Sequence, residues 1–184
     1  MTDLLTEQWT YEKYLTLPDD GKRYELIEGE LFVTPAPGSG HQFSSLQLTV
    51  TFHEFVKKNQ LGVVYYAPYE VHLPDQTRVV QPDILFIRAE NAPTAHDPYF
   101  VGVPDLVVEI ISPGSNRTDR YVKFGVYESA GVPEYWIVDP KGKSVTIYVL
   151  KDGEYEEWIQ AVGDEMITSQ VLAGLEIRNS SLFL

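Results

Sequence analysis

The 184-residue sequence contains no cysteine. This absence excludes disulfide bonds, thiolate nucleophiles, and zinc or iron–sulfur centres held by cysteine. No stretch approaches the roughly 18 consecutive apolar residues of a membrane-spanning helix, and the initial residues MTDLLTEQWTYEKY lack a basic region followed by an apolar run. We therefore expect a cytoplasmic protein with no membrane partner.

Several catalytic motifs are also missing. The chain has neither the G-x-x-x-x-G-K loop that binds phosphates nor the G-x-S-x-G turn that carries a nucleophilic serine. His53 and His72 do not form the H-E-x-x-H spacing of a helical zinc site. These absences disfavour P-loop, serine-hydrolase and zinc-protease chemistry.

Basic residues are few. The chain has 14 Lys and Arg against 27 Asp and Glu, a formal net charge of -13 and a pI of about 4.6. The average field of such a surface repels polyanions, which disfavours general binding to nucleic acids or anionic membranes. A local basic site remains compatible with this average.

The length and the 43% hydrophobic content are sufficient for one sizeable core, and we predict a single domain over residues 1–184. Glu28-Gly29 is a turn pair between two alternating stretches, which predicts an N-terminal β-hairpin. Beyond residue 161 we expect only a short strand. The apolar periodicities predict helices at 11–17, 41–58 and 118–130, and strands at 23–27, 30–34, 63–73 (long or broken), 79–87, 106–111, 134–140, 144–150 and 154–160.

The segment from Pro104 to Phe124 is the most informative part of the sequence. Residues 106–111 are apolar on both alternating faces, as in a strand covered on both sides, yet Glu109 lies in the middle. A buried carboxylate loses its hydration, at a large cost unless a cation or hydrogen bonds replace the water. We therefore expect Glu109 to have a positive partner in a functional site. The alternatives are a structural arginine partner, or a strand twist that carries Glu109 to solvent.

Asp83 stands at the entry of another apolar strand, one loop earlier in the chain. Neighbouring strands would bring Asp83 and Glu109 together at one place on a sheet. Two adjacent carboxylates repel each other, whereas Mg²⁺ or Mn²⁺ between them lets both stay ionised. Hard oxygen ligands favour these ions over zinc, so the pair predicts a magnesium or manganese site.

Lys123 is the third candidate. It shares a helix face with Arg120 and Tyr127, at the border of the packing stripe, so its stem can run under apolar neighbours while the ammonium points at the sheet. An ammonium group there favours hydroxide over water and stabilises charge on a phosphate under attack. The alternative is an ordinary surface lysine.

Several segments together resemble the Uma family of proteins classed with the restriction endonucleases. The resemblance extends from about Arg23 to Tyr148 and is carried by RYELIEGEL, PAPGSGHQ, VVQPDILFI, PDLVVEIISP, DRYVKFGVYESAGVPEYWIVDP and the hairpin that follows. It implies an α/β (α+β) fold of the restriction-endonuclease-like type. The expected architecture is a mixed sheet flanked by helices, with a core over about residues 23–150, an N-terminal hairpin and a C-terminal antiparallel extension.

The resemblance also implies metal-dependent phosphodiester cleavage. Pro82-Asp83 matches the P-D part of the superfamily signature and Glu109 matches its acidic position. Ile111 stands where the superfamily has lysine, and the family resemblance assigns that role to Lys123 on the following helix. The implied metal ligands are Asp83, Glu109 and the carbonyl of Ile110.

Further site residues are assigned with an alternative for each. Glu25 matches a recurrent acidic position of the family, or is an edge-strand residue facing solvent. His41 contacts phosphate or caps the helix that follows it, and capping is the favoured interpretation. Gln81 orients a metal-bound water or is a loop polar group, and Tyr127 belongs either to the site or to the core.

Arg117 and Arg120 form, with Lys123, a compact basic cluster that suits a phosphate backbone. The alternative is an ordinary solvated helix end. Tyr65, Tyr66 and Tyr69 are expected on an edge strand, where pairing with a second copy in a homodimer is plausible.

The sequence therefore predicts a Mg²⁺- or Mn²⁺-dependent endonuclease acting on DNA. A first alternative is an inactive module of the same fold that binds nucleic acid or a protein. A second is a hydrolase that uses Asp83 and Glu109 as an acid and base pair, as glycosidases do, and needs no metal.

Overall fold

The computed structural model describes residues 8–18, 20–34, 36–74, 77–112 and 121–184. Its centre is a six-stranded sheet made of β3 (Gly62–Tyr66), β6 (Ile84–Arg88), β8 (Leu106–Ile110), β9 (Glu134–Asp139), β10 (Ser144–Lys151) and β11 (Glu154–Val162). The strand order is β11-β10-β9-β8-β6-β3. Strands β8 and β9 run parallel while the other neighbours are antiparallel, so the sheet is mixed, as predicted.

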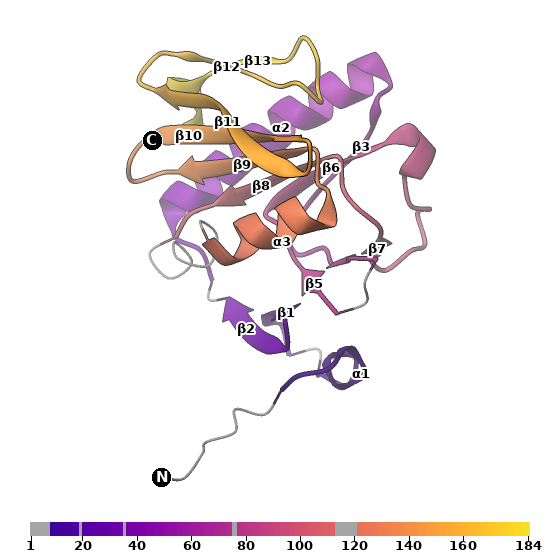
Figure 1. The fold of residues 1–184 in the computed structure, drawn as a ribbon. Helices are drawn as coiled ribbons and strands as arrows, with labels where there is room; N and C mark the ends of the chain where they lie inside the picture. Colours follow the sequence, from indigo (N-terminus) through magenta and orange to yellow (C-terminus); the bar gives the residue numbers. More distant parts are fainter. Residues whose placement is uncertain (1–7, 19, 35, 75–76, 113–120) are drawn as a thin grey trace.

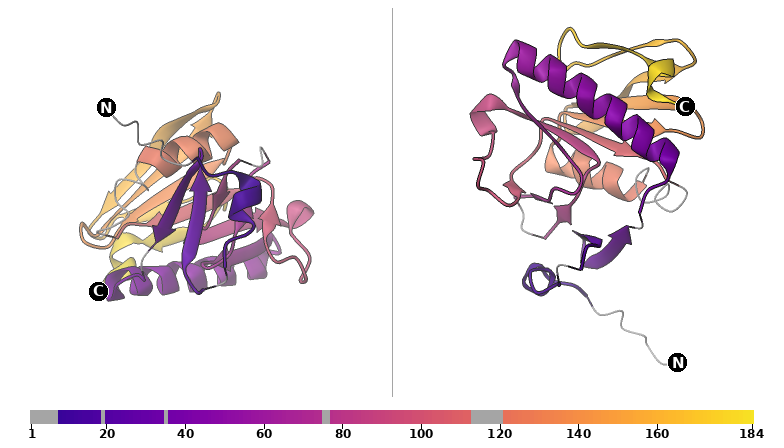
Figure 2. Two further views of the ribbon diagram at one scale, coloured as in Figure 1. Left: turned by 90° about the horizontal axis from the view of Figure 1, so that it is seen from below. Right: turned by 180° about the vertical axis from the view of Figure 1, so that it is seen from behind.

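Helix α2 (Ser39–Asn59) covers one face of this sheet (Figure 2, right). Ser44, Leu48, Phe52 and Val56 recur every four residues, and all four are buried. They form a stripe that packs on the side chains of the central strands, including Trp136. The helix predicted at 41–58 is thus confirmed.

Helix α3 (Lys123–Ala130) covers the opposite face (Figure 1). Val126 and Tyr127 pack against alternate residues of the central strands, including Leu85 and Val107. Both faces of these strands are therefore buried, which explains why their sequences are apolar without alternation. The predicted helix at 118–130 is observed as α3 from Lys123 to Ala130, and residues 118–120 lie outside the described ranges.

A second, five-stranded sheet has the order β2-β1-β5-β4-β7. It lies at the bottom of Figure 1 beside the short helix α1 (Tyr11–Tyr14), which Thr10 caps as its side chain accepts from the Lys13 N–H. Apolar residues of this sheet, such as Val71, share one core cluster with α3. Its strands are β1 (Arg23–Ile27), β2 (Glu30–Thr34), β4 (Val71–His72), β5 (Val79–Val80) and β7 (Phe100–Val101), and η1 (Ala89–Asn91) follows β6.

Two predicted strands are divided between the sheets. The stretch 63–73 is broken into β3 and β4, and the single strand predicted at 79–87 is wrong, because it consists of β5 and β6. The reason lies at Gln81 and Pro82. The Gln81 N–H donates to the Glu25 carboxylate, and proline has no N–H, so no strand ladder continues there.

The C-terminal part is an antiparallel extension, as predicted, but the tail contributes more than one short strand. It comprises β12 (Met166–Thr168), β13 (Glu176–Arg178) and η3 (Asn179–Leu182). Leu172 and Leu182 enter the core on the α2 side. The buried Glu134 carboxylate joins the tail to β9, because it accepts from the Ser169 hydroxyl and the Val171 N–H. Within the described ranges, no helix has both the length and the apolar character needed to cross a membrane.

Phe52 tests the packing of α2 on the sheet. Its ring meets Trp136 edge-on, with centroids 5.3 Å apart. We expect Phe52→Ala to lower the free energy of unfolding by about 4 kcal/mol, because a fully buried aromatic side chain leaves a cavity. Leu46→Ala, at a position 59% exposed on the same helix, is the control and should change it by less than about 0.5 kcal/mol. Denaturant unfolding measures both, and similar losses would contradict this packing.

Candidate active site

Asp83 immediately precedes β6, and Glu109 lies on the neighbouring strand β8. The β6–β8 register pairs Ile84 with Val108, and the next step along this antiparallel ladder sets Asp83 across from Glu109. Residues that face each other across such a pair point to the same side of the sheet. The Ile110 N–H donates to Asp83 Oδ2 at 2.8 Å, so the Asp83 carboxylate reaches the backbone beside Glu109.

A buried ammonium group stands on the α3 side of this pair. Lys123, the first residue of α3, is 3% exposed, and its Nζ is 2.9 Å from Oε1 of both Glu25 and Glu109. One turn later, the Tyr127 hydroxyl donates to Glu109 Oε1 at 2.6 Å. The spacing of four residues places both donors on one helix face. Glu109 therefore has the cationic partner that its burial requires.

Tyr127 is held as a neutral donor. Its hydroxyl is buried, and burial raises the pKa of Tyr127 well above its ordinary value, with the charges of Glu109 and Glu25 acting in the same direction. The phenol therefore keeps its proton and continues to donate to Glu109.

A second set of contacts surrounds Asp83, which is 4% exposed. Arg23 Nη1 lies 3.1 Å from Oδ1, and His41 Nε2 lies 3.0 Å from Oδ2. Burial acts to raise the pKa of Asp83, but the His41 hydrogen bond and the charges of His41, Arg23 and Lys123 outweigh it. The pKa of Asp83 is therefore below its ordinary value, and the carboxylate is ionised at neutral pH.

Glu25 and Gln81 connect the two sheets at the site. Glu25, in β1, is buried and accepts from the Gln81 N–H at 2.7 Å as well as contacting Lys123. The Gln81 side-chain amide donates to the carbonyl of Tyr24 and to Glu70, each at 3.3 Å. Glu25 thus does not face solvent, and Gln81 holds the crossing between the sheets.

A polar network next to the site was not predicted. The Tyr14 hydroxyl donates to Glu70 at 2.7 Å, His72 Nε2 lies 2.9 Å from the other Glu70 oxygen, and the Tyr11 hydroxyl lies 2.7 Å from His72 Nδ1. Gln81 joins this network to Glu25. The sequence carries only a weak signal for it, the alternation of Glu70 and His72 at the end of an apolar stretch.

Three predicted residues differ from their assignments or cannot be placed. His41 does not cap α2, because the N-cap is Gly38 and makes no side-chain capping bond, while His41 lies inside the first turn and contacts Asp83. The favoured capping interpretation was therefore wrong. Arg117 and Arg120 lie outside the described residues. Arg23 was missed as a site residue, although it shares a strand face with Glu25 two positions later.

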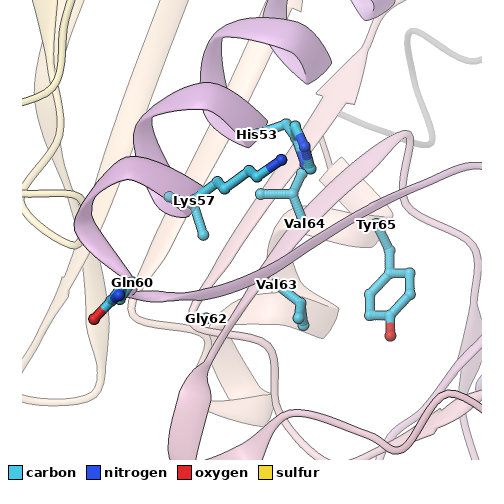
Figure 3. A pocket seen from close by; sticks show the side chains of 8 residues that line it. His53, Lys57, Gln60, Gly62, Val63, Val64 and Tyr65 are labelled. Carbon is cyan, nitrogen blue, oxygen red and sulfur yellow. The ribbon is translucent and has the colours of Figure 1, made fainter.

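A groove of about 1010 Å³ leads to Asp83. Arg23, His41, Gln81 and Asp83 line it, whereas Lys123 and its two glutamates are not among the lining residues. A smaller pocket of about 380 Å³ lies between α2 and β3, where His53 and Lys57 stand on the helix side (Figure 3). Among the described residues that line this second pocket, none carries a carboxylate.

The donors at the main site are hard oxygens, the type that Mg²⁺ and Mn²⁺ prefer. Across the described part of the chain, however, no three His, Asp or Glu side chains are grouped so as to hold a metal ion. The possible set is two carboxylates, Asp83 and Glu109, with a backbone carbonyl. In this arrangement, Asp83 accepts from Arg23 and Ile110 and contacts His41, so an ion would share or displace these partners.

This fold is shared with a solved structure. A crystal structure described as "a putative nuclease belonging to DUF820 from Anabaena variabilis ATCC 29413" is similar, with a TM-score of 0.79 and 20% sequence identity, over 95% of this chain and 97% of that one. No curated protein matches the sequence. The mixed sheet between two helices, with Asp83 immediately before β6 and Glu109 on β8, is thus the fold of that solved structure.

The sequence identifies the family within this fold class. The chain belongs to the Uma2 family, described as "Putative restriction endonuclease", whose profile matches residues 11–180. The match covers the hairpin, both helices of the sheet and most of the C-terminal extension, which is a longer span than the resemblance found from about Arg23 to Tyr148.

The contacts of Asp83 predict how the free energy of unfolding depends on pH in the acid range. A carboxylate with a lowered folded-state pKa stabilises the fold above its ordinary value of 3.8, and this contribution is lost as the pH falls through the folded-state pKa. We expect Asp83→Asn to cost about 3 kcal/mol at neutral pH, with the difference from wild type shrinking below about pH 4. Urea unfolding across this pH range measures it. Asp152→Asn, at the exposed turn between β10 and β11, is the control, and a pH-independent cost for Asp83→Asn would refute the pairing.

The ion pair between Lys123 and Glu109 predicts that substitutions at the two positions have coupled effects on the free energy of unfolding. We expect Lys123→Met to lower the free energy of unfolding by about 4 kcal/mol, because two buried carboxylates lose their ammonium partner. In a Glu109→Gln background the same substitution should cost at least about 1 kcal/mol less, since one of those charges is already gone. A double-mutant cycle by denaturant unfolding gives the coupling, and strictly additive losses would show that the two groups do not interact.

Proposed function

We propose that this protein is a metal-dependent nuclease that hydrolyses phosphodiester bonds in DNA. The observation that carries the proposal is that Asp83, at the start of β6, bonds to the Ile110 N–H beside Glu109, while the buried ammonium of Lys123 contacts Glu109 itself. Family membership supports a nuclease-like function. The groove supports it further, because it gives a substrate access to Asp83.

The chemical types of the candidate ligands suit a hard divalent cation. In the proposal Asp83, Glu109 and the Ile110 carbonyl hold Mg²⁺ or Mn²⁺, because carboxylate and carbonyl oxygens are their preferred ligands. The lowered pKa of Asp83 supports this role, since an ionised carboxylate is the form that binds a cation. The bound ion would supply positive charge against the charge that develops on the phosphate.

The protein's own groups orient the reaction. Lys123 holds the attacking water by a hydrogen bond and favours its hydroxide form through its positive charge. Glu25 keeps the ammonium in place from the side of β1, and Tyr127 fixes the Glu109 carboxylate. His41 and Arg23 line the groove beside Asp83, and in the proposal they contact a phosphate of the substrate.

The position of Lys123 compensates for a departure from the superfamily signature. Ile111 occupies the usual lysine position, and it is buried in the core cluster on the α3 side. Lys123 instead reaches Glu109 from the first turn of α3, with its nitrogen 2.9 Å from the carboxylate. The amine is therefore present at the acidic residue, although it comes from a different backbone position.

One observation favours a second candidate, a non-catalytic module with this fold. The oxygens of Asp83 that a metal ion would need already contact Arg23, His41 and the Ile110 N–H. A cluster of this kind is also a self-contained set of ion pairs that stabilises the fold. Such a module would bind nucleic acid or a protein partner, and as a homodimer it would use the outer edge of β3, the last strand of the six-stranded sheet.

Cleavage assays separate the two candidates. We expect the purified protein to cleave DNA in Mn²⁺ and not in chelator, and Glu109→Gln and Lys123→Met each to reduce the rate at least about 100-fold, as removal of groups acting on the reacting atoms does. Glu157→Gln on the exposed face of β11 is the matched control and should keep the wild-type rate. Circular dichroism on the same samples verifies that each variant is folded.

The opposite results have distinct meanings. Cleavage that survives both substitutions would remove Glu109 and Lys123 from the active site. Failure of the wild-type protein to bind Mn²⁺ in calorimetry would favour the non-catalytic module. Cleavage that persists in chelator would instead favour metal-free hydrolysis by a carboxylate pair.

A further inference from the structure

The groove that leads to Asp83 has an aromatic wall and polar atoms that the proposed reaction does not use. Its walls include the β1–β2 hairpin with Arg23, the start of α2 with His41, and the end of β3 with Tyr66 and the connection that follows it with Tyr69. The β3–β6 register pairs Tyr66 with Ile84, the residue after Asp83. The aromatic wall therefore begins one residue away from the proposed reaction centre.

Unpartnered polar atoms gather in this groove. Within the described residues, six buried side-chain nitrogen or oxygen atoms have no hydrogen-bond partner, and four belong to groove residues: Arg23 Nε, His41 Nδ1, Tyr69 Oη and Gln81 Oε1. A buried polar atom without a partner destabilises a protein, so such atoms are rare and require an explanation. Their concentration in one groove indicates a polar ligand that supplies the missing bonds.

The groove also presents aromatic surface. The Tyr66 side chain is 61% exposed on its wall. The Tyr69 ring is stacked on Tyr65 with centroids 4.3 Å apart and an angle of 16° between planes, which fixes its orientation. Aromatic faces beside cationic and donor groups are typical of sites for unpaired bases, because in a duplex the base faces are already stacked on each other.

The net charge of the protein and the depth of the groove favour a single nucleic-acid strand over a duplex as the ligand. The net charge of -13 opposes the many phosphate contacts that duplex binding needs, and among the described residues that line the groove the basic ones are Lys22, Arg23 and His41. Asp83 is nearly buried, and a stiff double helix does not bend into a recess as a single strand does. Glu70 on the same wall repels phosphate, although Tyr14 and Gln81 donate to its carboxylate.

We propose that this groove binds a single nucleic-acid strand, one base stacking on Tyr66 and the adjoining phosphate contacting Arg23 and His41. Tyr69 donates its hydroxyl to the strand, and the Gln81 carbonyl accepts from a base edge. This proposal builds on the nuclease function proposed above and assigns its substrate class as unpaired strands, such as frayed ends, flaps and single-stranded DNA. Occupancy of the groove is nevertheless measured separately from cleavage.

Binding is tested with a fluorescent, mixed-sequence DNA of about 12 nucleotides, alone and annealed to its complement, in buffer with Ca²⁺. We expect fluorescence anisotropy to give a Kd at least about tenfold lower for the single strand. Tyr66→Ala should raise that Kd about tenfold, the lower end of the effect of one lost stacking contact. Tyr66→Phe keeps the ring and should stay within about twofold of wild type. Trp158→Ala, an exposed aromatic on β11, is the control and should leave the Kd unchanged.

Tyr69→Phe gives a second, independent readout. Its hydroxyl has no partner in the free protein, so its removal should leave the melting temperature at or above that of wild type. The same substitution should weaken binding of the single strand several-fold, because the strand loses a donor. A drop in melting temperature without a change in Kd would mean that the hydroxyl serves the fold, which would overturn its assigned role.

The outcomes distinguish this proposal from the nuclease proposal. Duplex binding as tight as single-strand binding, or a Kd that Tyr66→Ala does not change, would overturn the single-strand groove. Cleavage of duplex but not of single strands in Mn²⁺ would also overturn it while the nuclease function stands. Tyr66-dependent binding of the single strand without cleavage in any divalent ion would support the groove and remove the nuclease function.

Discussion

The structure depends on the burial of one ammonium group between two carboxylates. Lys123 lies between Glu25 of the smaller sheet and Glu109 of the larger sheet, and it reaches both from the first residue of α3. Removing charges from water is costly, and mutual attraction offsets that cost only where the geometry is close and further hydrogen bonds are made. Here Gln81 and Tyr127 make those bonds, so the two sheets and α3 are held in one fixed relation.

The charged centre adjoins the apolar core on the α3 side, and a second core lies across the sheet beneath α2. The residues of the charged centre come from separate parts of the chain: Glu25 and Arg23 from β1, His41 from α2, Glu109 from β8 and Lys123 from α3. The low dielectric of these surroundings strengthens each pair and penalises any unpaired member. A site built in this way is positioned by rigid elements, which suits chemistry that requires fixed distances.

How far the sequence predicts this arrangement differs between residues. Glu109 within an apolar strand and Lys123 at the border of a helical stripe each conflict with simple burial rules, and the structure pairs them. Arg23 gave no such signal and Glu70 only a weak one, because their positions become meaningful only when the two sheets come together. Gln81 shows the same limit, since local pattern made residues 79–87 one strand, whereas a tertiary contact to Glu25 divides it. His41 was interpreted as a helix cap because the local pattern at the start of a helix carries no information about a partner that is distant in the sequence, here Asp83.

The central claim is that Asp83 and Glu109 form a divalent-cation site beside the Lys123 ammonium. The most direct measurement is a crystal structure of the protein soaked in Mn²⁺, with data collected at the manganese absorption edge. The account predicts an anomalous peak in contact with both carboxylates and the Ile110 carbonyl. A fully occupied Mn²⁺ elsewhere, with Asp83 still bound only to Arg23, His41 and the Ile110 N–H, would contradict it.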